Sequence, residues 1–103
     1  MPAVLSTPQM IGLLERTARQ ALLPFLENHE RSVGIEIDLR HLAPTPVGAT
    51  VTLTVRVVRA EDREVTFQVE ARDGQEMIAR GLHKRAVIRV ESFARRVAAK
   101  RAG

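Results

Sequence analysis

The sequence contains no cysteine, tryptophan or tyrosine, and only three of its 103 residues are phenylalanine. Without cysteine the chain can form neither a disulfide nor a thiolate metal site, which fits a reducing compartment. So few aromatic residues argue against a surface that stacks the bases of single-stranded nucleic acid. No apolar run approaches the length of a membrane span, and the first residues lack the basic start and long apolar run of a secretory signal. We therefore expect a cytoplasmic protein that does not enter membranes.

The residues that are present are typical of one globular domain covering positions 1–103. Apolar residues make up 45% of the chain, which is enough for a single hydrophobic core. Lysine and arginine (16) outnumber aspartate and glutamate (12), so the formal net charge is +4. Much of the excess falls in the last quarter of the chain. Such a basic segment attracts anionic partners, either nucleic acid or a phosphate-bearing small molecule, although a basic tail is often only a solvated end.

A first helix is predicted to begin at Thr7, which is a good N-cap, with Pro8 at the first helical position. Pro24 is expected to kink or end this helix. Apolar residues recur three or four positions apart along it and predict one core-facing stripe. The stripe consists of Ile11, Leu14, Ala18, Leu22 and Phe25.

Glu15 lies at the edge of this apolar stripe. Burying an ionised carboxylate costs several kcal/mol unless it has partners or keeps its proton, so Glu15 is a candidate for chemistry. The alternative is an exposed pair with Arg19, because a glutamate followed by an arginine four residues later forms an ordinary surface pair on a helix.

After the helix, the period of the apolar residues changes from about 3.6 to 2, which predicts half-buried strands of an antiparallel sheet. Segments 33–39, 51–57 and 65–69 show this alternation, with their apolar residues at odd positions. The same parity adds His41 to the apolar face of the first strand. The residues expected to share that face are Val33, Ile35, Ile37, Leu39 and His41.

A last strand is predicted over residues 76–90, followed by a short terminal helix from about Glu91. The apolar residues of this strand change parity, so we expect a bulge near Gly81. One helix followed by a four-stranded meander predicts the α+β class, with the helix across one face of the sheet. The exposed edges of so short a sheet favour self-association.

Thr7, Glu15 and His41 form a set of side chains that suits acyl transfer. A hydroxyl at a helix start, a half-buried carboxylate on the same helix and an imidazole at a strand end can position water, activate it and steady an acyl oxygen. The alternative for His41 is a structural histidine, and the alternative for Thr7 is a simple helix cap.

Several segments, taken in order and spacing, resemble the hot-dog-fold thioesterases, and within them the fluoroacetyl-CoA thioesterase-like group. The similarity runs over about residues 4–97, although no single motif in it is specific. The matching segments are 7–10, 14–16, 32–34, 41–48, 71–74 and 81–88.

The resemblance implies a hot-dog fold, in which a long helix is wrapped by an antiparallel sheet. It also implies a homodimer or higher homo-oligomer whose active sites form at the subunit interface. The family's catalytic residues would fall on Thr7, Glu15 and His41. Its backbone donor to the thioester oxygen would fall on Gly34, whose missing side chain lets a ligand approach.

Two further substrate-binding candidates lie in the last strand. Arg85, and with it Lys84 and Arg80, would meet the phosphates of coenzyme A, and the alternative is a solvated strand edge. His83 would line the pocket or only fill the bulge.

The activity that follows from the resemblance is hydrolysis of an acyl-CoA or similar thioester, with the coenzyme A thioester as substrate and no metal or other cofactor. The family usually carries an N-terminal strand and a lid before the helix, and this chain begins almost at the helix, so fluoroacetyl-CoA itself is not the expected substrate. Two alternatives stay open. One is a non-catalytic hot-dog module that binds acyl-CoA or only itself, and the less favoured one is a basic nucleic-acid-binding domain.

Overall fold

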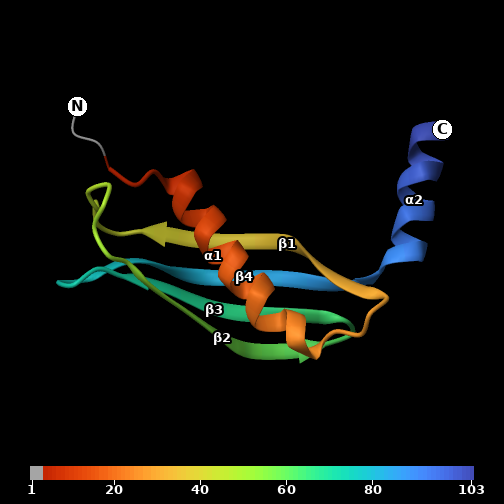
Figure 1. The fold of residues 1–103 in the computed structure, drawn as a ribbon, viewed down its shortest axis with the longest axis horizontal. Helices are drawn as coiled ribbons and strands as arrows, with labels where there is room; N and C mark the ends of the chain where they lie inside the picture. The colour runs from red at the N-terminus through yellow and green to blue at the C-terminus, as the bar shows by residue number, and fades with distance from the viewer. Residues whose placement is uncertain (1–3) are drawn as a thin grey trace.

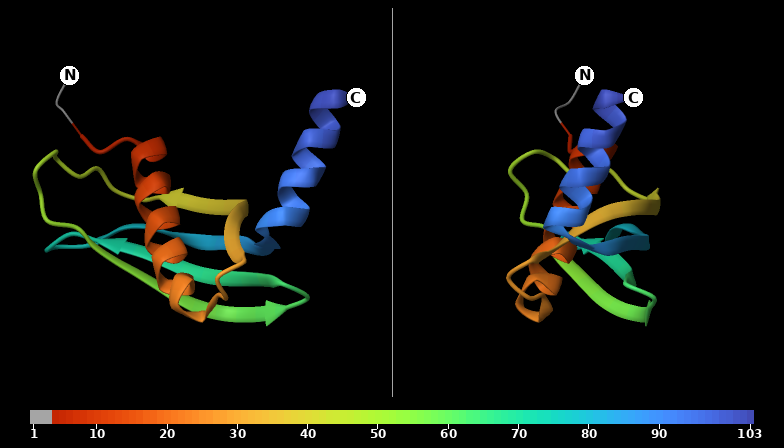
Figure 2. Two further views of the ribbon diagram at one scale, coloured as in Figure 1. Left: turned by 45° about the vertical axis from the view of Figure 1, so that its right-hand side comes forward. Right: turned by 90° about the vertical axis from the view of Figure 1, so that its right-hand side faces the viewer.

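A computed structural model describes residues 4–103, and in it two helices accompany a four-stranded antiparallel sheet (Figure 1). The strands lie in the order β1-β4-β3-β2, so β1 and β2 are the edges. Helix α1 crosses one face of the sheet, and α2 projects from the end of β4 on the β1 side (Figures 1 and 2). The elements are α1 (Thr7–Leu22), the short 3-10 helix η1 (Leu23–Phe25), β1 (Glu30–His41), β2 (Thr52–Glu61), β3 (Glu64–Arg72), β4 (Met77–Arg89) and α2 (Val90–Ala102).

The predicted α+β class, with a helix and four antiparallel strands, is confirmed. The short terminal helix also forms, as α2. Over residues 4–103, neither α1 nor α2 is long and apolar enough to cross a membrane.

The start of α1 differs from the prediction, because Ser6 rather than Thr7 is the N-cap. The Ser6 hydroxyl accepts from the Gln9 backbone N–H, and the Gln9 side chain accepts from the Ser6 N–H at 3.0 Å. This reciprocal pair is a capping box, which satisfies two backbone donors at once. Thr7 is therefore the first helical residue, and its hydroxyl is available for another partner.

The core lies between α1 and the sheet. Pro24 lies in η1, two residues beyond the end of α1, and η1 turns the chain so that Phe25 is 82% exposed, against the prediction that it belongs to the core stripe. The buried residues of α1 are Met10, Leu14, Ala18 and Leu22. They pack against buried residues of β3 and β4, namely Val65, Phe67, Val69, Ala71, Ile78 and Ala79.

Strand β1 changes face halfway along its length, because the register with β4 shifts at Ile35. We call the sheet face that contacts α1 the helix face, and the opposite one the outer face. An extra residue in one strand reverses the alternation of side chains beyond it. Gly34 and Ile37 therefore both lie on the helix face, and Val33 and Ile35 lie on the outer face. The prediction that residues 33 to 39 keep one parity is therefore wrong.

In β4, the extra residue is Ile78, so the bulge expected near Gly81 is misplaced. From Ala79 onward the odd-numbered residues face α1 without interruption. They include His83, which is 1% exposed, and Arg85, which is 4% exposed. The apolar even-numbered residues that suggested a change of parity in β4 lie on the outer face instead.

Candidate active site

A first cluster of polar groups lies where α1 crosses the beginning of β1. The Glu15 side chain is 41% exposed, and its Oε2 lies 3.9 Å from Nη1 of Arg85. A Cβ atom placed on Gly34 would come within 2.8 Å of Glu15 Oε2 and 3.2 Å of His83 Cε1. The carboxylate therefore reaches the β1 backbone because residue 34 has no side chain. Within residues 4–103, the ion-pair partner of Glu15 is Arg85 and not Arg19.

Arg85 is fixed by Ser32 and His83. It donates from Nε to Ser32 Oγ (2.9 Å) and from Nη2 to the Ser32 carbonyl (3.0 Å), and its Nη1 lies 3.1 Å from His83 Nε2. On the other side of the ring, His83 Nδ1 is 2.9 Å from the Glu36 carbonyl oxygen. A carbonyl only accepts, so Nδ1 carries the hydrogen and Nε2 accepts from Arg85. Burial lowers the pKa of the Arg85 guanidinium, and the Glu15 carboxylate opposes that shift.

These contacts bear on the residues predicted to meet coenzyme A. Arg85 is neither on a solvated edge nor free for a phosphate, because its three nitrogens have protein partners. His83 is buried between Arg85 and β1, where it supports the guanidinium rather than filling a bulge. Lys84 points to the outer face and lies 3.6 Å from a Glu36 carboxylate oxygen.

A second cluster joins the start of α1 to the end of β1. A hydrogen bond of 2.9 Å connects Thr7 Oγ1 and His41 Nδ1. The other ring nitrogen of His41, Nε2, is buried and has no hydrogen-bond partner among residues 4–103. A buried ring nitrogen without a partner is costly, so this one is suited to a ligand.

The two clusters are separate within one protomer. Glu15 follows Thr7 by eight residues, or about 12 Å along the helix axis. Gly34 and His41 are about 20 Å apart along β1. The structure therefore brings Glu15 to Gly34 and Thr7 to His41, but it does not join the two pairs. Over residues 4–103, no group of three histidine, aspartate or glutamate side chains is placed to hold a metal ion.

A family model and a relative of known name both match this chain and indicate the same family. A family model described as fluoroacetyl-CoA-specific thioesterase (FlK) matches residues 1–91. The fluoroacetyl-CoA thioesterase of Streptantibioticus cattleyicolor is 42% identical over 92 residues, which make up 89% of this chain and 66% of that protein. The chain thus spans about two thirds of the length of this relative.

Solved structures agree with the family match. A structure of the fluoroacetyl-CoA thioesterase FlK superposes with a TM-score of 0.90 at 41% identity, covering 97% of this chain and 74% of the other. A hot-dog-like protein from Thermanaerovibrio acidaminovorans superposes with a TM-score of 0.91 at 30% identity, covering 95% and 73%. The predicted hot-dog fold is confirmed.

Proposed function

Because the chain belongs to the family of fluoroacetyl-CoA-specific thioesterases, we propose that it hydrolyses an acyl-CoA thioester in an active site shared between two protomers. The observation that carries this proposal is the pairing of groups in the two clusters. One cluster contains the Glu15 carboxylate beside Gly34, where the backbone has no side chain. The other contains the buried Nε2 of His41, which has no hydrogen-bond partner among residues 4–103. The cytoplasmic location and the homo-oligomer stay predictions.

The chemistry divides between the clusters. Glu15 takes a proton from water as the water oxygen bonds to the thioester carbon, or its carboxylate attacks that carbon directly and forms an anhydride, which water then hydrolyses to the free acid and the Glu15 carboxylate. The backbone N–H of Gly34 donates to the developing oxyanion. As the carbon–sulfur bond breaks, His41 Nε2 delivers a proton to the leaving thiolate, and Thr7 holds the ring through Nδ1. A proton-transfer group of this kind is worth roughly 10²–10⁴ in rate. Arg85 is a positioning residue, since it acts through Glu15.

A second protomer would bring the clusters together. Strand β1 is an edge, so it is available to pair with the β1 strand of a partner. In an antiparallel pair related by a two-fold axis, the beginning of one strand lies beside the end of the other. The Glu15–Gly34 pair of one protomer would then face the Thr7–His41 pair of its partner.

Mixing two inactive variants tests this shared site. We expect Glu15→Gln and His41→Ala to be inactive separately and to regain about one quarter of wild-type activity when unfolded together and refolded as a 1:1 mixture. Half of the dimers are then mixed, and each mixed dimer has one of its two sites intact. The measurement is release of free thiol from a panel of acyl-CoA substrates that includes acetyl-CoA and fluoroacetyl-CoA.

The controls are each variant refolded alone and a Glu15→Gln/His41→Ala double variant refolded with wild type. Failure of the single variants to complement, in a protein that hydrolyses thioesters, would place the whole site within one protomer. Binding of acyl-CoA by wild type without any turnover would contradict hydrolysis and favour the non-catalytic module.

Gly34→Ala is expected to reduce thioester hydrolysis by about tenfold or more, because the new methyl group would lie 2.8 Å from Glu15 Oε2 and displace the carboxylate. The matched control is Gly12→Ala on α1, where a Cβ meets nothing within 4 Å. That variant should keep its activity and gain roughly 0.5–1 kcal/mol of stability from the helix preference of alanine. Steady-state kinetics and urea unfolding measure both effects, and equal activity of the two variants would contradict the role given to Gly34.

A further inference from the structure

His83 is a buried titratable side chain to which the proposed chemistry assigns no role. It lies beside Arg85 on the helix face of β4. Both ring nitrogens have partners, since Nδ1 lies 2.9 Å from the Glu36 carbonyl oxygen and Nε2 lies 3.1 Å from Arg85 Nη1. A carbonyl accepts and a guanidinium donates, so the ring carries its hydrogen on Nδ1 and accepts at Nε2. The backbone of β1 therefore fixes the tautomer that Arg85 requires.

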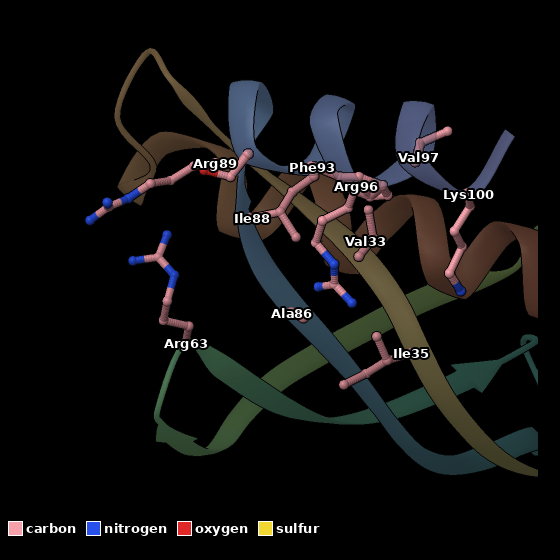
Figure 3. A pocket seen from close by; sticks show the side chains of 11 residues that line it. Val33, Ile35, Arg63, Ala86, Ile88, Arg89, Phe93, Arg96, Val97 and Lys100 are labelled. Carbon is pink, nitrogen blue, oxygen red and sulfur yellow. The ribbon is translucent and has the colours of Figure 1, made fainter. Parts of the chain in front are cut away.

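The burial of Arg85 distinguishes it from the cations on the other side of the sheet. Arg89, Arg96 and Lys100 are exposed around a groove of about 740 Å³ beneath α2, on the outer face (Figure 3). An exposed cation can change its conformation and take water as its partner. The Arg85 guanidinium is buried and hydrogen-bonded within the protein, so its protein partners determine where each of its nitrogens lies.

The position of Arg85 Nη1 relative to Glu15 follows from its bond to His83. Nη1 lies 3.1 Å from His83 Nε2 but 3.9 Å from Glu15 Oε2. The first distance is that of a hydrogen bond, and the second is too long for one. Arg85 therefore interacts with Glu15 through its charge without donating a hydrogen bond to Oε2. The lone pairs of that oxygen stay available for the proton of water.

The three side chains meet beside Gly34. A Cβ atom placed on Gly34 would lie 2.8 Å from Glu15 Oε2, 3.2 Å from His83 Cε1 and 3.5 Å from Arg85 Nη1. The carboxylate, the imidazole and the guanidinium thus border one space next to the backbone N–H to which the proposed reaction assigns the thioester oxygen. A movement of Nη1 by roughly 1 Å would bring it within hydrogen-bond distance of Glu15 Oε2.

We propose that His83 is a further positioning residue for thioester hydrolysis, whose Nε2 holds the Arg85 guanidinium back from Glu15 and so keeps the carboxylate reactive. This inference rests on the proposed function, because it concerns how Glu15 remains able to take a proton or attack the thioester. A carboxylate that accepts a hydrogen bond from a guanidinium is stabilised in its ionised form, which makes it a weaker base and a weaker nucleophile.

Two substitutions of His83 separate the two hydrogen bonds of the ring. In His83→Gln the amide oxygen can replace Nε2 as the acceptor for Arg85, and in His83→Asn the amide N–H can replace Nδ1 as the donor to the Glu36 carbonyl. Each variant therefore loses one of the two bonds. We expect His83→Gln to keep a kcat close to that of wild type, and His83→Asn to lower kcat about tenfold or more with little change in KM. Thiol release from an acyl-CoA measures both constants, and His29→Asn, at an exposed histidine, is the control.

A double-mutant cycle tests whether His83 acts through Arg85. In an Arg85→Met background, His83→Asn should lower kcat no further, because the guanidinium that His83 positions is absent. Crystal structures provide a measurement that does not depend on activity. The distance from Arg85 Nη1 to Glu15 Oε2 should stay near 3.9 Å in His83→Gln and shorten to about 3.0 Å in His83→Asn.

Several outcomes would overturn the proposal. Equal kcat in His83→Gln and His83→Asn would leave His83 with a structural role alone, and an equal loss from His83→Asn in both backgrounds would show that it does not act through Arg85. Nitrogen NMR of the wild-type ring needs no variant to fold, and a hydrogen on Nε2 would contradict the proposal. If the wild type hydrolyses no thioester, the proposed function fails separately. The crystal structures then test the inference, and an unchanged distance between Nη1 and Oε2 in His83→Asn would refute it.

Discussion

Replacing Glu15 with glutamine is expected to reduce kcat/KM for thioester hydrolysis by about 10²–10⁴ while leaving the fold intact. Glutamine has nearly the shape of glutamate but cannot take up the proton of water or attack the thioester carbon. Arg85 keeps its hydrogen bonds to Ser32 and His83, so a neutral glutamine at position 15 does not leave the guanidinium without hydrogen-bond partners. Thiol release measures the activity, and circular dichroism with thermal unfolding measures the fold.

The matched control is Glu27→Gln, which makes the same chemical change at a side chain that is 73% exposed. It should keep wild-type kinetics, because this exposed carboxylate lies 3.5 Å from His29 and belongs to neither cluster. Full activity in Glu15→Gln would mean that neither the general-base role nor the nucleophilic role of Glu15 is correct.

The largest effect on stability is expected for Gly81→Ala. A Cβ at residue 81 would lie 2.0 Å from the carbonyl oxygen of Asp38 and 2.9 Å from the Cα of Leu39. These are backbone atoms of the paired strand β1, so they cannot swing aside as a side chain would, and β1 must separate from β4. We expect a loss of about 3 kcal/mol or more in the free energy of unfolding, measured by urea denaturation. The activity should fall too, because β1 carries Gly34 and His41.

Gly74→Ala serves as the control for this second variant. Gly74 lies in the turn between β3 and β4, where a Cβ would meet nothing within 4 Å. Its stability should change by about 0.5 kcal/mol at most. Equal stability of the two alanine variants would mean that the strands can rearrange around residue 81 at little cost.

The sequence was sufficient to predict the order of elements and the family, but not which side of β1 each residue faces. Alternation of apolar residues defines a strand, yet a single extra residue reverses the faces without changing that pattern. Val33 and Ile35 are as apolar as Ile37 and Leu39, so periodicity alone could not separate them. The bulge at Ile35 shows only in the pairing with β4.

The sequence predicted which residues form the candidate site but not how they are arranged, and their catalytic roles stay predictions. Thr7, Glu15 and His41 were recognised as candidates, but their arrangement in two separate pairs depends on how α1 crosses β1. A local signal for the freedom of Thr7 was available, since Ser6 and Gln9 have the spacing of a capping box. Ser32 was missed as a partner of Arg85, because a serine hydroxyl in a strand carries no distinctive pattern. The contact between His83 Nδ1 and the Glu36 carbonyl was also missed, because it depends on how β1 pairs with β4, which the sequence does not show.

The extra residues in the edge strands also restrict how this protein can aggregate. β1 contains Ile35, and β2 has a register shift between Val57 and Arg59. A regular edge offers an even row of backbone donors and acceptors, onto which strands of any neighbour can add without limit, as in amyloid. An edge strand with an extra residue twists locally, so its backbone donors and acceptors are no longer evenly spaced. A regular strand from another molecule then pairs with it less readily. In the proposed dimer, where β1 pairs with its own copy, these interruptions would favour a small closed assembly over fibrils.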